Sequence, residues 1–311
     1  MKPAARPAAW PAARPAAWPP ARARGLVPGG LALLASLALL GGCAQTGAER
    51  PALQIDSQTY RAQGQDSRVQ FLILHYTDED MARSARILTE QAVSAHYLLS
   101  DENPPRVYRL VDENRRAWHA GASHWAGSSN LNSASIGIEI VNAGAEKNAD
   151  GSQRFTPYPE AQMDLMLALV RDIVARHQIK PERVLGHSDI APQRKIDPGP
   201  LFPWWRLAEA GLIAWPDAAR VAAVQPVFEA RLPGVAWFQE ALARHGFQVD
   251  RHGLLDEPTR RVIAAFQMKY RPARHDGQPD AETAARLQVL TGLAPPPAAA
   301  PAANGTAPAT P

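Results

Sequence analysis

The sequence predicts an α/β or α+β domain of roughly 150 residues, followed by a small all-helical domain. Strand and helix patterns alternate between residues 63 and 215, whereas helical patterns alone fill residues 231–292. A chain of 311 residues is long enough for both domains, and its 46% hydrophobic and 20% charged content is ordinary for a globular protein. Residues 216–230 are rich in alanine and valine, and we expect them to be a linker between the domains.

Two strands and one long helix define the first domain. Residues 69–75 (VQFLILH) form a nearly continuous apolar run, which is typical of a strand buried on both faces. Residues 134–142 (ASIGIEIVN) are rich in isoleucine and predict a second strand. Between residues 160 and 177 apolar side chains recur every three or four positions, so they predict one face of a helix that Pro159 can begin.

The N-terminal segment has the features of a secretory signal. Residues 31–42 (LALLASLALLGG) follow five basic residues and precede Cys43, the only cysteine, so no disulfide can form within the chain. The apolar run is too short to span a membrane. Residues 40–43 (LGGC) resemble the lipobox of bacterial lipoproteins, in which the cysteine is lipidated; a plain signal peptide is the alternative. Ala44 after that cysteine implies, by the lipoprotein sorting rule, an outer-membrane lipoprotein that faces the periplasm.

Removal of residues 1–42 changes the charge balance. The remaining chain has 28 basic and 30 acidic residues, a net charge of −2, so the pI of 9.2 reflects the leader. This balance argues against a nucleic-acid partner. Residues 43–62 are polar and are expected to be a tether. Residues 293–311 contain little that could be buried, and we expect a disordered tail.

Polar residues at the ends of two expected strands indicate a metal site. His75 ends the first strand, and a short strand at 183–185 leads into GHSDIAPQRKIDPGP (186–200), which contains His187 and Asp197. Two histidines and one carboxylate suit zinc by ligand type, and three protein ligands are usual for catalytic zinc. Each histidine alone could instead be a surface or hydrogen-bonded core residue, since the spacing is weak evidence.

Lys195 and Glu139 could add chemistry to this site. Lys195 lies two positions before Asp197, so in an extended segment both side chains point the same way. An ammonium group there could stabilise negative charge on a substrate oxygen. Glu139 lies on the strand face opposite the neighbouring isoleucines, where a carboxylate is costly unless it has a partner or a task. An edge-strand glutamate facing water is the alternative.

Five motifs in a fixed order carry a family resemblance. They are ILHYT (73–77), SAHYLL (94–99), AWHAG (117–121), SIGIEIVN (135–142) and GHSDIAPQRKIDPGP (186–200). Over roughly residues 65–215 the chain resembles the zinc-dependent N-acetylmuramoyl-L-alanine amidases of the amidase-2 type, relatives of the peptidoglycan recognition proteins, and within them a branch of outer-membrane lipoproteins. The resemblance implies a mixed central sheet flanked by helices. It also implies one zinc ion held by His75, His187 and Asp197, with Glu139 and Lys195 as the catalytic pair.

Other residues of these motifs have weaker assignments. Trp118 and His119 are candidates for lining the substrate groove, and Arg194 is a candidate for meeting a carboxylate of the peptide stem. We interpret His96 as a packed structural residue. Asp189 is expected to hold the shape of its loop.

The helical segment 231–292 resembles the three-helix peptidoglycan-binding domain, chiefly through DEPTRRVIAAFQ (256–267). A module that only packs on the first domain is the alternative. The segment contains an internal repeat, GLLDEPT and GQPDAET, in which Asp256 and Asp280 can each cap the helix that follows. The expected partners are therefore peptidoglycan and muropeptides, with a membrane reached through the lipid on Cys43.

The function implied by the resemblance is hydrolysis of the amide between N-acetylmuramic acid, intact or 1,6-anhydro, and L-alanine of the stem peptide, in cell-wall turnover. A non-catalytic peptidoglycan receptor of the same fold is the main alternative, but a receptor does not need Asp197, Glu139 and Lys195 together. A lytic glycosidase would need a positioned pair of carboxylates instead.

Overall fold

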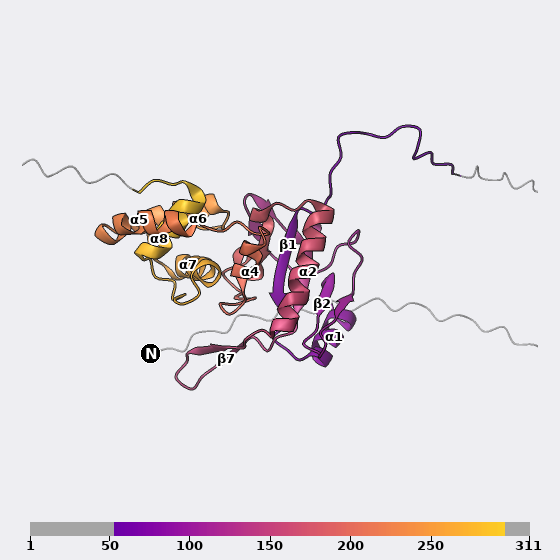
Figure 1. Cartoon of the computed structure of the whole chain (residues 1–311), viewed down its shortest axis with the longest axis horizontal. Coiled ribbons are helices and arrows are strands. Elements are labelled where there is room, and N and C mark those ends of the chain that lie inside the picture. The colour runs from indigo at the N-terminus through magenta and orange to yellow at the C-terminus, as the bar shows by residue number, and fades with distance from the viewer. Residues whose placement is uncertain (1–52, 296–311) are drawn as a thin grey trace, which may run out of the picture. The chain divides into compact units, whose positions relative to one another are not determined.

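The computed structural model describes residues 53–295 (Figure 1). The expected signal segment, Cys43 and most of the expected tail lie outside these residues. No helix within the described residues is both long and apolar enough to cross a bilayer. Residues 53–61 are exposed and have no helix or strand.

A five-stranded sheet forms the centre of the first domain, with strand order β3-β2-β6-β1-β9. Its strands are β1 (Phe71–Tyr76), β2 (Tyr97–Leu99), β3 (Val107–Arg109), β6 (Ser135–Ile140) and β9 (Val184–Gly186). β1, β2, β6 and β9 run parallel, whereas β3 pairs antiparallel with β2, so the mixed sheet is confirmed. The expected strands at 69–75, 134–142 and 183–185 are β1, β6 and β9, with ends shifted by one or two residues.

Helix α2 (Glu160–His177) covers one face of this sheet, and in Figure 1 it runs beside β1. It begins directly after Pro159, as the sequence predicts. Its buried apolar side chains share one core with the isoleucines of β6; the set comprises Met163, Met166, Val170, Ile173, Ile136, Ile138 and Ile140. The alternating pattern of β6 therefore directs Glu139 away from this core, toward the other side of the sheet.

The shorter elements surround the sheet. They are α1 (Met81–Glu90), β4 (His124–Trp125), β5 (Ser128–Ser129), η1 (Leu131–Ser133), β7 (Ala145–Lys147), β8 (Gln153–Phe155), η2 (Pro181–Arg183), α3 (His187–Ile190) and α4 (Trp204–Glu209).

The parallel register brings three chain segments to one edge: His75 of β1 is paired with Glu139 of β6, and β9 runs directly into α3. The carboxyl ends of parallel strands are where open α/β sheets usually place their sites.

The second domain consists of α5 (Ala218–Ala230), α6 (Val235–His245), α7 (Glu257–Tyr270) and α8 (Ala281–Thr291). Helices α6, α7 and α8 are the three expected within 231–292. The segment 216–230, expected as a linker, instead forms α5, which packs against α8 and buries Val221 and Phe228. Alanine favours a helix, and the buried apolar side chains stabilise it against the other helices.

The internal repeat gives two equivalent turns. The carboxylates of Asp256 and Asp280 accept hydrogen bonds from the backbone N–H groups three residues later, at 2.9 and 2.8 Å, so both predicted caps are confirmed. A buried glutamine braces each loop in the same way. Gln239 Oε1 accepts from the N–H of Gly253 at 2.8 Å, and Gln267 Oε1 accepts from the N–H of Gly277 at 2.9 Å.

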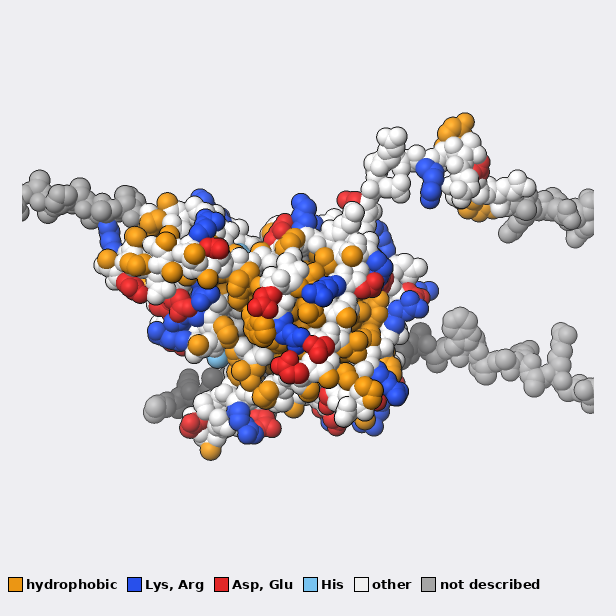
Figure 2. All heavy atoms as spheres, in the orientation of Figure 1, with side chains coloured by type: hydrophobic (Ala, Val, Ile, Leu, Met, Phe, Trp, Pro, Cys, Tyr) orange, Lys and Arg blue, Asp and Glu red, His pale blue; other side chains and the backbone are white. Residues whose placement is uncertain are grey.

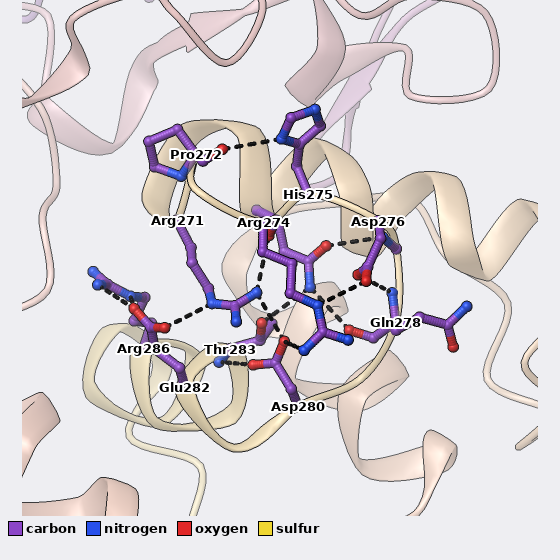
Figure 3. A network of polar contacts seen from close by, with 12 residues as sticks. Arg271, Pro272, Arg274, His275, Asp276, Gln278, Asp280, Glu282, Thr283 and Arg286 are labelled. Carbon is purple, nitrogen blue, oxygen red and sulfur yellow. Dashed lines mark hydrogen bonds and ion pairs between the residues drawn. The ribbon is translucent and has the colours of Figure 1, made fainter. Parts of the chain in front are cut away.

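Ion pairs tie the second repeat together (Figure 3). The Arg271 guanidinium contacts Asp280 at 2.8 Å and Glu282 at 2.7 Å, which joins the end of α7 to the start of α8. The expected tail begins within this domain, since Leu293 packs on its core and the carbonyl of Ala294 accepts a 2.8 Å hydrogen bond from Trp237.

The two domains share one hydrophobic core. Trp125 of β4 packs edge-to-face on His245 and Phe247, with ring centroids 5.5 and 5.0 Å apart. A buried ion pair crosses the same junction, with Lys269 Nζ 2.8 Å from Asp189 Oδ2. The face of the molecule seen in Figure 2 mixes acidic and basic side chains, so it does not offer the basic surface that nucleic-acid binding requires.

Candidate metal centre

Three side chains converge at the carboxyl edge of the sheet. His75 lies near the end of β1, His187 is the first residue of α3, and Asp197 lies in the segment that follows. Nδ1 of His75 is 2.9 Å from Nδ1 of His187, and each of these nitrogens is 3.2 Å from Oδ2 of Asp197. All three residues are buried, and their candidate ligand atoms lie within 4.8 Å of one another.

The loop that carries His187 and Asp197 is held by its own backbone and by Asp189. The N–H of Ser188 donates to the carbonyl of Asp197 at 2.9 Å, which fixes the two ends of the loop together. Asp189 Oδ2 accepts from the N–H of Gly186 at 2.8 Å as well as from Lys269. Asp189 therefore does hold the loop in shape.

The contact made by Nε2 of His187 determines which of its two ring nitrogens carries the proton. Nε2 lies 3.3 Å from the carbonyl oxygen of Ala120, which can only accept a hydrogen bond. The proton of a neutral His187 is therefore on Nε2, and the lone pair of Nδ1 faces His75 and Asp197. The second nitrogen of His75 is 3.0 Å from Nδ1 of another histidine, His119.

Burial and charge shift the pKa values of His75 and Asp197 toward the forms that bind a metal, a neutral imidazole and a carboxylate. Burial, with a smaller effect from His187, lowers the pKa of His75 to about 4. Burial alone would raise the pKa of Asp197, but the His187 and His75 rings hold it well below its usual range. Two imidazoles and one carboxylate form a donor set that suits zinc. The residues present therefore fit a zinc ion.

Glu139 and Lys195 line the same cavity, which has a volume of about 440 Å³. The Oε2 atom of Glu139 is buried and has no hydrogen-bond partner among the described residues. Burial, and then the nearby carboxylate of Asp197, raise the pKa of Glu139 well above its ordinary value, while Lys195 lowers it. The alternative of an edge-strand glutamate facing water does not fit, because β6 is an interior strand of the sheet.

The three groove candidates also line this cavity, but they differ in exposure. Trp118 is 50% exposed, and the guanidinium of Arg116 lies 4.0 Å from its ring centroid. His119 is 8% exposed. Arg194 uses Nη2 to donate to the carbonyls of Ala120 and Ala122, so part of this side chain holds that loop.

His96 is fully buried, as the sequence interpretation expects, and it lies outside the cavity lining. Its Nδ1 accepts from the N–H of Gly137 at 3.0 Å, and its Nε2 lies 3.2 Å from the carbonyl of Arg115. Both nitrogens are therefore used within the fold.

Sequence reasoning did not identify several cavity residues. Tyr76 and Asp78 line the cavity just beyond β1, and Ala145 and Gln153 of the β7–β8 hairpin line it from another side. Burial raises the pKa of Tyr76, so its phenol stays protonated. Tyr76 directly follows His75 and could have been considered, whereas nothing in the hairpin sequence indicated its position.

The family models match the same two parts of the chain. Residues 65–200 match the Amidase_2 family of N-acetylmuramoyl-L-alanine amidases, and residues 231–287 match the PG_binding_1 family of peptidoglycan binding domains. The fold and the site thus define an amidase domain joined to a domain of the peptidoglycan-binding type.

The similarity to one curated amidase extends over most of the chain. The chain is 44% identical to the N-acetylmuramoyl-L-alanine amidase AmiD of Escherichia coli K12 over 272 residues, which is 83% of this chain and 95% of that protein. The solved complex of E. coli AmiD with anhydro-N-acetylmuramic acid-L-Ala-D-gamma-Glu-L-Lys matches with a TM-score of 0.70, covering 78% of this chain and 95% of that one. AmpDh3 of Pseudomonas aeruginosa, in complex with anhydromuramic pentapeptide, matches with a TM-score of 0.72 at 42% identity, covering 77% of this chain and 98% of that one. The chain belongs to the N-acetylmuramoyl-L-alanine amidase family, and it is similar to AmiD along most of its length.

Proposed function

We propose that this protein uses one zinc ion, held by His75, His187 and Asp197, to hydrolyse the amide between N-acetylmuramic acid and L-alanine of a peptidoglycan stem peptide. The observation that carries this proposal is the convergence of the His75 and His187 imidazoles with the Asp197 carboxylate. His187 and Asp197 also line one cavity with Glu139, whose Oε2 atom has no hydrogen-bond partner among the described residues. A receptor that only binds muropeptides would not need a buried carboxylate without a partner, because such a group costs free energy.

The relatives support a substrate class for this proposal. E. coli AmiD was solved with an anhydro-N-acetylmuramic acid tripeptide as its substrate, and AmpDh3 with an anhydromuramic pentapeptide. Because the chain covers nearly all of both relatives, we infer that 1,6-anhydro muropeptides enter the same cavity here. Such substrates place the reaction in cell-wall turnover or recycling.

Different residues of the cavity carry out different steps of the reaction. Zinc, when bound, would supply Lewis acidity and make water a usable nucleophile near neutral pH. Glu139 takes a proton from the attacking water as its oxygen bonds to the amide carbon, and the carbonyl becomes an oxyanion. Lys195 provides positive charge against that oxyanion. Glu139 then gives its proton to the nitrogen of L-alanine, and the carbon–nitrogen bond breaks. The remaining hydroxyl proton passes to the released amine, which leaves a lactyl carboxylate and an ammonium group.

The remaining parts of the chain suit attachment to the envelope. The lipobox-like residues 40–43 support a lipid anchor on Cys43 and an outer-membrane, periplasm-facing location. The second domain belongs to a family named for peptidoglycan binding, which supports a role in holding the enzyme on its polymer. Mass spectrometry of the membrane-retained tryptic peptide that begins at Cys43 tests the anchor; acyl chains on Cys43 are expected, and an unmodified Cys43 would refute it.

A chelation experiment tests the proposed reaction. Purified protein lacking the signal segment is incubated with anhydro-muropeptides and with whole peptidoglycan, and the products are separated by mass. We expect release of intact stem peptides, loss of this release with a chelator, and its return when zinc is added. Binding of muropeptides without release would refute the amidase and support a receptor, and release that survives complete metal removal would refute the zinc mechanism.

A further inference from the structure

Whether Nδ1 of His75, the nitrogen that faces His187 and Asp197, carries a proton depends on the contact made by the other ring nitrogen, Nε2. Nε2 of His75 lies 3.0 Å from Nδ1 of His119, and Nε2 of His119 lies 3.2 Å from Oγ of Ser135. The hydroxyl of Ser135 also contacts the carbonyl oxygen of Leu131 at 2.7 Å. These residues form a continuous chain of hydrogen bonds from a backbone carbonyl to a candidate zinc ligand.

The direction of each hydrogen bond follows from the carbonyl at its end. A carbonyl oxygen only accepts, so the single hydroxyl proton of Ser135 is donated to Leu131. Oγ of Ser135 must then accept from Nε2–H of His119. A neutral His119 has no second ring proton, so its Nδ1 accepts from Nε2–H of His75. Nδ1 of His75 is left with its lone pair, facing His187 and Asp197.

The arrangement in which each of these hydrogen bonds runs in the opposite direction is disfavoured. If His75 carried its proton on Nδ1, its Nε2 would need a donor, and His119 would have to donate from Nδ1. Nε2 of His119 would then place a lone pair against the lone pair of Ser135 unless Ser135 abandoned Leu131, leaving a buried carbonyl without that donor. Unsatisfied buried polar groups cost about 1–3 kcal/mol.

Close packing keeps His119 in this position. A side chain at residue 137 would place its Cβ only 2.4–2.6 Å from the His119 ring, so glycine at this point of β6 makes room for the imidazole. His119 is 8% exposed and Ser135 is 4% exposed, so water does not replace these hydrogen bonds readily. The ring is therefore fixed in place by both contact and hydrogen bonding.

We propose that Ser135 and His119 form a relay that fixes His75 in the tautomer with an unprotonated Nδ1, which makes His119 a positioning residue for the metal centre. The relay rests on the proposed zinc function of His75. It gives His119 a role distinct from that of a groove residue, since it acts on the ligand and not on the substrate. Outer partners of metal-binding histidines typically contribute about 10- to 100-fold to metal affinity.

Three variants of the full chain test the relay: His119→Phe, Ser135→Ala and the double variant. Phenylalanine retains a ring against Gly137 but removes both nitrogens. Zinc affinity is measured by competition with a chromogenic chelator, and the tautomer of His75 is measured in the metal-free protein by ¹⁵N NMR of the imidazole nitrogens. Ser100→Ala, which alters a fully buried serine away from the cavity, is the matched control, and circular dichroism checks folding.

We expect His119→Phe to bind zinc about 10- to 100-fold more weakly than the parent, and Ser135→Ala to lose less. The double variant should be no weaker than His119→Phe, because Ser135 acts only through His119. In the metal-free parent His75 should be protonated on Nε2, and Ser135→Ala should populate both tautomers.

Parental zinc affinity in a folded His119→Phe variant, or a His75 proton on Nδ1 in the metal-free parent, would overturn the relay. A parent protein that binds no zinc would instead refute the proposed function. The tautomer of His75 in the metal-free protein would then still test the relay independently of zinc binding.

Discussion

The ion pair between Lys269 and Asp189 gives the sharpest prediction about stability. Lys269 of α7 is 4% exposed and Asp189 of α3 is 1% exposed on their side chains, and the two charged atoms are 2.8 Å apart. The ammonium also contacts the carbonyl of Val184 at 3.2 Å and lies 4.4 Å from the ring centroid of Trp204. The perturbation is Lys269→Met, which keeps the length of the stem and removes the charge.

The expected loss is large because a carboxylate would be left buried without its cation. Removing one partner of a buried pair typically costs about 3–5 kcal/mol, whereas removing both charges is often near neutral. We therefore expect Lys269→Met to lower the free energy of unfolding by about 3–5 kcal/mol, and Lys269→Met with Asp189→Asn to recover much of that loss.

The assay is equilibrium unfolding in urea at neutral pH, followed by tryptophan fluorescence and circular dichroism. Arg244→Met is the control, since its i,i+4 pair with Glu240 is exposed and should contribute less than about 1 kcal/mol. If Lys269→Met stayed within about 1 kcal/mol of the parent, the buried carboxylate would be compensated by other groups, and the reasoning would be wrong.

Three further predictions concern the site and the pH response. Glu139→Gln should keep zinc affinity but lose nearly all turnover. The control Glu146→Gln, on the exposed β7 strand, should keep both. Equal turnover in the two variants would remove Glu139 from the mechanism. Lys195→Met should lower kcat by about 100- to 1000-fold, measured on an anhydro-muropeptide, and an unchanged kcat would exclude the oxyanion role. Burial lowers the pKa of His245 to about 3, so the unfolded chain binds more protons than the folded one below pH 6.5. The contribution of His245 to stability should therefore be fully present above about pH 6.5 and fall as the pH drops toward 3. Urea unfolding at pH 7 and pH 4.5 measures this fall, and His245→Phe should reduce it. An equal loss of unfolding free energy in the variant and the parent would contradict the prediction.

Much of the first domain could be predicted because its main elements have strong local signals. The apolar run of β1 and the helical period of α2 depend on burial that the sequence itself displays. The alanine-rich pattern of 216–230 has little amphipathic character and so indicates a linker, whereas the structure has helix α5 there. Its burial comes from contact with α8, more than fifty residues further along the chain.

The site was predictable only in part for a related reason. The motifs carried His75, His187, Asp197, Glu139 and Lys195 through a family resemblance. The structure places the last four around one cavity and brings His75 into contact with His187 and Asp197. Spacing alone could not have done this, because the parallel register of β1, β6 and β9 determines which distant residues meet.

The hydrogen-bond partners of those residues were not predictable from local sequence. The role of His119 depends on a glycine in β6 that leaves space for its ring, and on a serine whose proton is already committed to a carbonyl. Neither feature changes hydrophobic periodicity or secondary-structure propensity. AWHAG therefore drew attention to His119 as a groove residue, whereas its side chain is mostly buried and both of its ring nitrogens contact other side chains.

The position of Lys269 bears on what the second domain does. Asp189 lies two residues after His187, and its carboxylate holds the backbone of Gly186 on one side and Lys269 on the other. The loop that carries two candidate zinc ligands is thus braced by α7 of the second domain. Loss of that domain would expose Trp125 and leave Asp189 without its cation, so the domain supports the geometry of the metal centre whether or not it also binds the polymer.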